Sequence, residues 1–174
     1  CLMLSQEVKL IMEAENAIET FLTQVEHTDE DDTRTLVARL ISVLCSNGNT
    51  VCQQQLREQN GIRLLVRVLL HFTESRRVQV GKKAGVKIQF QPEGEDNGGS
   101  EDNTGGQVSI LVVAIIDCLQ KSIVGNKKSE SAFAQEEGMD MLLNLLEVCQ
   151  FIQRVQILRI LSDMLVNNKL LSFV

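Results

Sequence analysis

Two stretches decide the fold: Gly61-Ile62-Arg63-Leu64-Leu65-Val66-Arg67-Val68-Leu69-Leu70 and Gly138-Met139-Asp140-Met141-Leu142-Leu143-Asn144-Leu145-Leu146. In each, a glycine opens an almost unbroken apolar run, and a Gly-Asn pair stands thirteen positions before that glycine, at 48–49 and 125–126. The two copies are 77 positions apart. Similarity at a fixed offset indicates repeated units that stack on one another. Such an architecture points to a surface that binds other macromolecules.

A third copy extends the repeat. The residues 151–166 predict a long helix that matches the one expected over 35–45 at an offset of 120, with Arg39 opposite Arg159 and Ser42 opposite Ser162. Setting aside the 34 residues of 73–106 leaves a period near 43. Periods of about 40–47 with three helices per unit are typical of armadillo and HEAT arrays.

Apolar residues spaced three and four apart predict helices along nearly all of the chain outside 73–106. We expect the acidic run 29–32 to be a solvated loop. Asp32 or Thr33 is expected to cap the helix that follows it, which is the second helix of the chain. The glycines Gly48, Gly61, Gly125 and Gly138 are predicted to form the repeat turns, and Gly61 is expected to need a positive φ. The predicted helices span 2–25, 35–45, 50–59, 62–72, 107–124, 129–136, 139–149 and 151–166.

The fold class that follows is all-α: a right-handed armadillo-like solenoid of about two and a half units, formed by 1–72 and 107–174. The segment 73–106 is an insertion. Alternating apolar residues predict a β-hairpin over 76–90, and one proline, five glycines and five acids predict disorder over 91–106. Because the chain begins with Cys1 and ends in an apolar run, we expect it to be part of a longer solenoid.

Composition argues against several classes of function. The net charge of −6 disfavours nucleic acid, and no apolar run approaches the roughly 20 residues that cross a bilayer. Five cysteines lie at no metal-ligand spacing, which predicts free thiols in a reducing, intracellular compartment. No convergent acid, base or nucleophile is evident, so we expect no catalytic residue, metal or cofactor.

Polar residues interrupt the apolar faces of the long helices, and basic residues gather in the insertion. Both sets are candidates for binding other proteins, although each also fits an ordinary solvated surface. The first set is Arg39, Ser42, Asp117, Gln120, Arg159 and Asp163, and the second is Arg76, Arg77, Lys82, Lys83 and Lys87.

The runs 135–146 and 157–168, with their "EEG…LLxLL" turn and "IL…NN" helix, resemble the armadillo-type domain of a cilia- and flagella-associated protein. This resemblance implies a non-enzymatic structural component of the axoneme, part of a large complex with axonemal proteins and tubulin on the microtubule cytoskeleton. Two alternatives stay open. One is a soluble armadillo adaptor for signalling or transport that binds extended peptides, and the other is the regulatory region of a larger enzyme.

Overall fold

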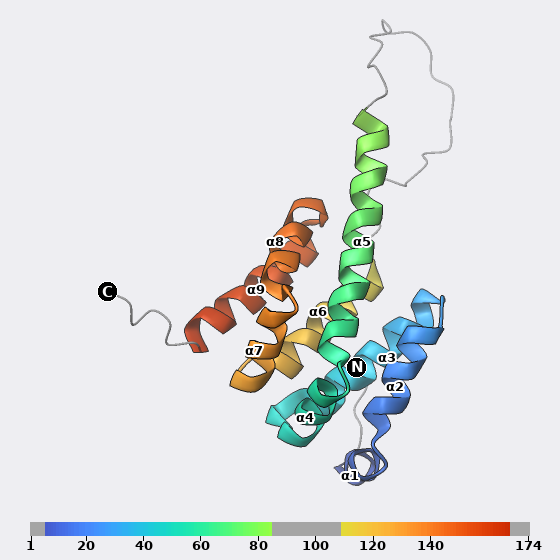
Figure 1. Cartoon of the computed structure of the whole chain (residues 1–174), viewed down its shortest axis with the longest axis vertical. Helices are drawn as coiled ribbons and strands as arrows, with labels where there is room; N and C mark the ends of the chain where they lie inside the picture. The colour runs from blue at the N-terminus through green and yellow to red at the C-terminus, as the bar shows by residue number, and fades with distance from the viewer. Residues whose placement is uncertain (1–5, 85–108, 168–174) are drawn as a thin grey trace, which may run out of the picture.

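The computed structural model describes residues 6–84 and 109–167, and in these ranges it contains helices and no strand (Figure 1). The predicted all-α class is therefore confirmed for this part of the chain. A short 3₁₀ turn at Ser46–Gly48 joins two of the helices. The α-helices are α1 (Gln6–Ala14), α2 (Ala17–His27), α3 (Asp31–Cys45), α4 (Thr50–Glu58), α5 (Gly61–Ala84), α6 (Ile110–Ile123), α7 (Lys127–Gln135), α8 (Gly138–Val148) and α9 (Phe151–Asn167).

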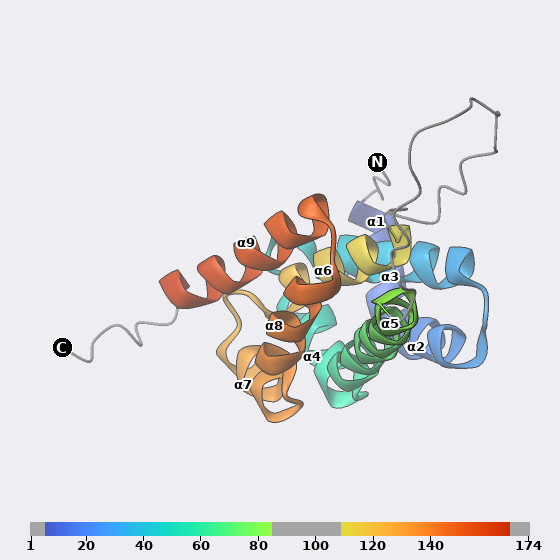
Figure 2. The same cartoon turned by 90° about the horizontal axis from the view of Figure 1, so that it is seen from above.

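The helices follow one another in three triplets, α1–α3, α4–α6 and α7–α9. The third helices pack in the order α3, α6, α9, which we call the long-helix row, and the second helices pack in the order α2, α5, α8 (Figure 2). The short first helices α4 and α7 also pack against each other. Segments far apart in the sequence are thus brought side by side, as the 77-residue offset predicts.

Each triplet turns from its first to its second helix at the same kind of residue. Asn16, Asn60 and Glu137 each adopt a left-handed conformation, with φ of 52°, 58° and 57°, directly before α2, α5 and α8. The predicted single helix over 2–25 is therefore wrong, because α1 ends at Ala14 and a separate α2 begins after the left-handed Asn16. The side chain of Gln59 stabilises this turn, since its Nε2 donates to Oδ1 of Asn16 at 2.8 Å.

The glycines after these turns have a different role from the predicted one. Gly61 and Gly138 lack a positive φ, which belongs instead to the residue before each of them. A Cβ at Gly61 would clash with the Leu56 side chain and lie 2.9 Å from the Leu56 carbonyl oxygen, and a Cβ at Gly138 would overlap the Phe133 ring. These glycines thus let the second helix of a triplet lie directly on the buried residue five positions earlier.

The turns between triplets agree with the sequence prediction. Gly48 and Gly125 have φ of +71° and +83°, which favours glycine. The asparagine after each glycine caps the next helix: Oδ1 of Asn49 accepts from the Cys52 N–H at 3.2 Å, and Oδ1 of Asn126 accepts from the Ser129 N–H at 3.3 Å. Side-chain caps of this kind satisfy backbone donors that have no partner within the helix.

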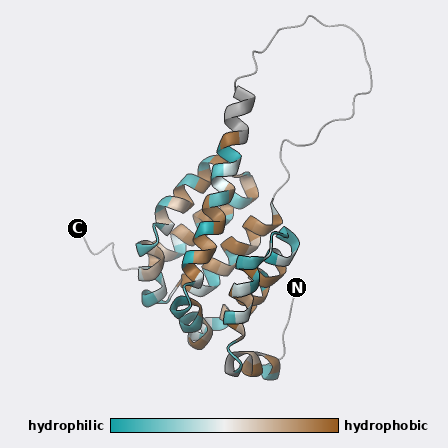
Figure 3. Ribbon diagram, turned by 45° about the vertical axis from the view of Figure 1, so that its right-hand side comes forward, coloured by the Kyte–Doolittle hydropathy of each residue, from teal (hydrophilic) through white to brown (hydrophobic). Residues whose placement is uncertain are grey.

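The core runs without interruption through all three triplets. Buried aliphatic residues of α2, α3, α5, α6, α8 and α9 form one cluster. Figure 3 shows hydrophobic residues, in brown, recurring along the helices. Phe133 on α7 is the largest of the fully buried side chains. A continuous core of this kind means that each triplet buries its apolar faces mainly against its neighbours.

Helix α5 is more than twice as long as predicted, and the predicted hairpin is wrong where it can be checked. Residues 76–84 continue α5, while 85–106 lie outside the described residues. Three contacts favour the helix over a strand. The Thr73 hydroxyl donates to the Leu69 carbonyl at 2.8 Å, the Arg76 guanidinium lies 5.4 Å from the Phe72 ring centroid, and Arg77 binds α8.

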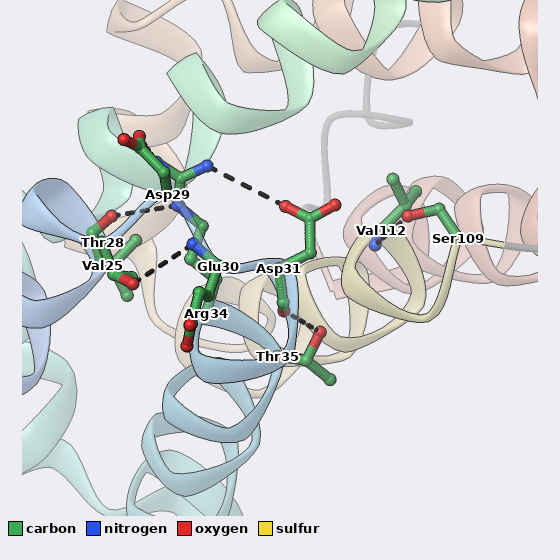
Figure 4. Close-up of polar contacts among 9 residues, drawn as sticks. All are labelled: Val25, Thr28, Asp29, Glu30, Asp31, Arg34, Thr35, Ser109 and Val112. Carbon is green, nitrogen blue, oxygen red and sulfur yellow. Dashed lines mark hydrogen bonds and ion pairs between the residues drawn. The ribbon is translucent and has the colours of Figure 1, made fainter.

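The acidic turn between α2 and α3 is held by Arg34 (Figure 4). Its Nε donates to the Val25 carbonyl at 3.2 Å, and its terminal nitrogens lie 3.8 Å from Asp29 and 4.0 Å from Asp31. Helix α3 begins at Asp31 with Glu30 at its cap position, two to three residues before the predicted caps Asp32 and Thr33. The acids near this helix start are favourable for its dipole.

Candidate protein-binding surface

The long-helix row carries the first set of predicted binding residues, and the fold pairs most of them with one another. The Ser42 hydroxyl of α3 donates to Asp117 of α6 at 2.5 Å. The Gln120 amide of α6 donates to Asp163 of α9 at 2.8 Å, and Arg159 lies 4.0 Å from the same carboxylate. These contacts join each third helix to the next. Arg39 is exposed on α3, with no partner among the described residues.

The pairing changes what these side chains can do. A binding groove requires polar groups that are free to meet a partner, whereas Asp117 and Asp163 are already bonded within the row. Their first effect is to fix the register between neighbouring third helices. Hydrogen bonds with a charged partner contribute about 1.5–3 kcal/mol when they are shielded, and less at the partly exposed Asp163.

A second polar network, not predicted from the sequence, joins α4 to the following triplet. Gln53 is 4% exposed. Its Nε2 donates to the Lys121 carbonyl at 2.9 Å, and its Oε1 accepts from Nδ2 of Asn126 at 2.9 Å. The Gly125 N–H donates to Oε1 of Glu130 at 3.0 Å in the same turn. The sequence signals were the repeated asparagine and, at the same offset of 77, the polar pair Gln53 and Glu130, both of which are buried.

The basic residues expected in a hairpin are distributed differently. Arg77 donates to Glu147 at 2.8 Å and to Asn144 at 3.0 Å, both on α8. Lys82 and Lys83 belong to the last turn of α5, and Lys87 lies outside the described residues. Arg77 therefore attaches the far part of α5 to α8, while Arg76 lies over the Phe72 ring of its own helix, so neither residue lies in a hairpin.

The buried cysteines are chemically protected. Burial, with a smaller contribution from Cys52, raises the pKa of Cys45 to about 12, and burial raises the pKa of Cys118 well above its ordinary value. Burial also raises the pKa of Cys149 to about 11, against the opposing effect of Arg154. A thiol reacts through its thiolate, so these three groups are inert near neutral pH.

Two further features concern membranes and metals. Among residues 6–84 and 109–167, no helix is both long and apolar enough to cross a bilayer. The same residues hold no cluster of three histidine, cysteine or acidic side chains suited to a metal ion.

Comparison with known proteins relates the second half of the chain to a protein family. Residues 101–174 match the family model described as "Cilia- and flagella-associated protein 69, ARM repeat". The match includes α6 to α9, and with it the two runs 135–146 and 157–168 on which the resemblance rested. The armadillo-type resemblance is thereby confirmed for this part of the chain. No curated protein and no solved structure matches the chain.

Proposed function

We propose that the chain is a non-enzymatic scaffold of the ciliary or flagellar axoneme, and that it binds other proteins through an armadillo solenoid. The observation that carries the proposal is the match of residues 101–174 to an armadillo repeat of a cilia- and flagella-associated protein. Armadillo units stack into extended surfaces that suit protein partners. Axonemal proteins and tubulin are the partners that this location would offer.

A right-handed superhelix is part of the same proposal, with α1–α3, α4–α6 and α7–α9 as three successive units. Support comes from the left-handed residue that precedes the second helix in each triplet, at Asn16, Asn60 and Glu137. The sequence suggested about two and a half units because the first of these turns was hidden within one apolar pattern.

The arrangement of polar groups favours a structural scaffold over an adaptor that binds extended peptides along the long-helix row. Ser42, Asp117, Gln120 and Asp163 are bonded to one another across that row. A peptide entering there would have to break these contacts before forming its own, which lowers its net affinity. The free surfaces of the solenoid are therefore the better candidates for partner contact.

Extraction and crosslinking of the tagged protein in ciliated cells test the proposal. We expect the protein to stay with detergent-extracted axonemes and to crosslink to axonemal chains. The role of the inserted segment is tested by replacing 85–106 with a Gly-Ser linker of equal length, since 73–84 belong to α5 and must be kept. Crosslinks from Lys82 or Lys83 that persist in this variant would show that α5 itself makes the contact.

Two outcomes would contradict the proposal. Complete release by detergent, with crosslinks only to cytosolic proteins, would favour the soluble adaptor. Catalytic activity that depends on this chain in a larger enzyme would favour a regulatory region.

A further inference from the structure

A cleft of about 550 Å³ opens to solvent where α4, α5 and α7 meet. It lies at the beginning of α5, while the inserted segment follows the other end of that helix, about 36 Å away at 1.5 Å per residue. Its lining includes four cations, Arg57, Arg63, Lys127 and Lys128, and one carboxylate, Glu136. We call these four cations and the space between them the basic cleft.

The cations of the basic cleft are mostly unneutralised. Glu136 lies 3.5 Å from Arg63 and offsets its charge. The side chains of Arg57, Lys127 and Lys128 form no ion pair or hydrogen bond within the described ranges. Lys127 and Lys128 are exposed and Arg57 is half-buried. The chain as a whole carries a net charge of −6, so this concentration of positive charge runs against its overall balance.

The position of the two lysines gives a second, independent reason to assign them to a ligand. Lys127 and Lys128 occupy the first turn of α7, where the positive end of the helix dipole disfavours cations. The first turn of α5, with Arg63, borders the same cleft. Both helix starts add positive potential to that of the side chains. Two lysines at the start of α7 destabilise that helix when the cleft is empty, whereas the same positive charges stabilise an anion bound there.

We infer that the basic cleft binds an extended acidic segment of a partner protein, through carboxylates that reach Arg57, Lys127 and Lys128. The inference rests on the proposed scaffold function and names the chemical class of one partner. A peptide fits better than a nucleic acid, because the neighbouring cleft between α2 and α5 presents Glu19 and Glu26 beside Arg63 and Arg67 and so adds no net positive charge. A phosphate backbone requires a continuous basic track, whereas a short acidic peptide requires only the cations of the basic cleft.

The probe is a short fluorescent peptide in which glutamate alternates with glycine, and its control has glutamine in place of glutamate. Binding to the whole chain is measured by fluorescence anisotropy at physiological salt. The double variant R57E/K128E reverses two cations of the cleft. Its matched control, R39E/K121E, reverses two exposed cations on the long-helix row and changes the net charge equally. Circular dichroism establishes that both variants are folded.

We expect the glutamate peptide to bind, the glutamine peptide to bind at least about tenfold more weakly, and R57E/K128E to lose about tenfold or more in affinity. R39E/K121E should stay within about threefold of the unaltered chain. Equal losses in both variants would mean unspecific attraction and would overturn the inference. So would a larger loss in R39E/K121E, or stronger competition by duplex DNA than by the acidic peptide.

The two proposals fail separately. If the peptide does not bind and the protein still stays with axonemes, only the basic cleft is wrong. If the peptide binds through the cleft and the protein is fully released by detergent, the acidic partner belongs to another compartment and the axonemal proposal fails.

Discussion

Helices α6 and α9 carry similar residues at four equivalent positions, which we call the stripe, but these positions are buried on α6 and exposed on α9. On α6 the stripe is Val112, Ile115, Leu119 and Ser122, and on α9, 43 positions later, it is Val155, Leu158, Ser162 and Leu165. The first four are at most 1% exposed, whereas the three apolar residues on α9 are 49–55% exposed. Helix α6 lies between α3 and α9, and α9 is the last of the row among the described residues.

The difference shows that an apolar face in a repeat is adapted to the next unit. The same stripe on α3, at Thr35, Ala38, Ser42 and Cys45, is at most 7% exposed, and its Ser42 bonds to α6. Spacings of three, four and three residues keep each stripe on one side of its helix. Burial is therefore decided by the neighbouring helix, because small and polar residues on α3 are buried while more apolar residues at the equivalent positions of α9 are exposed.

The largest expected contrast is in thiol reactivity. Cys45 and Leu165 are equivalent positions on α3 and α9, and the pKa of Cys45 is raised to about 12 from an ordinary 9.0. In the variant Leu165→Cys, the new thiol should react with iodoacetamide at an ordinary rate. Cys45 should react at least about a thousandfold more slowly, because three pKa units reduce its thiolate by that factor. Mass spectrometry of the individual peptides measures both rates and keeps Cys1 separate. Equally slow reaction of the two thiols would mean that the stripe on α9 is covered.

Next is the cost of truncating a stripe residue. Ile115→Ala should lower the free energy of unfolding by about 3 kcal/mol, since it leaves a cavity in a fully buried site. The equivalent change on α9, Leu158→Ala, should cost less than about 1 kcal/mol. Chemical denaturation of both variants measures the pair. Equal costs would show that Leu158 is buried in the protein as it exists in solution.

The buried thiols should also make stability depend on alkaline pH. The folded-state pKa of Cys45 is raised, so the unfolded chain loses this proton first. The stabilisation is complete below pH 9.0 and is lost as the pH rises toward about 12. Each such thiol should contribute a decline of up to about 1.4 kcal/mol per pH unit in this window. The chain has no tyrosine to add a titration there.

Urea denaturation between pH 8 and pH 11 measures this slope, with Cys45→Ala as the control variant. The control should show a shallower decline. A stability that is flat across the window would contradict the burial of these thiols.

The smallest expected effect compares two equivalent turns. Glu137 has a φ of 57°, which costs about 1 kcal/mol for a residue of this type. Glu137→Gly should therefore raise the free energy of unfolding by about 0.5 kcal/mol, after the entropy that glycine adds to the unfolded chain. Asn60→Gly should be close to neutral, because asparagine already tolerates this conformation. Thermal unfolding compares the two, and a loss of stability in Glu137→Gly would mean that its side chain has another role.

The repeat itself was predictable because Gly61 and Gly138 stand beside long apolar runs whose length leaves little choice but helix. The turn at Asn16 was missed because alanine, at position 17, stands where the other copies have glycine. The end of α5 was misassigned because Val78 and Val80 alternate as in a strand, while the contacts that decide for helix come from distant Asn144 and Glu147.

The candidate sites were less predictable than the helices. Positions such as Asp117 and Gln120 could be assigned to one surface by helical spacing, but spacing does not reveal that they bond to neighbouring helices. The basic cleft was missed because Arg57 and Lys128 come from separate helices. Their closeness depends on the packing of α4 against α7, which leaves no mark on the local sequence.

The last part of α5 extends beyond the helices that hold it, so a force on this end is transmitted along the helix. Seven residues, Val78 to Ala84, continue past Arg77 for about 10 Å, and Figure 1 shows this end reaching beyond its neighbours. A sideways force applied at Ala84 would turn α5 about its attachment to α8 and load the Arg77 to Glu147 ion pair first. Because the same helix begins at the basic cleft, we expect strain at one end to reach the proposed partner site at the other.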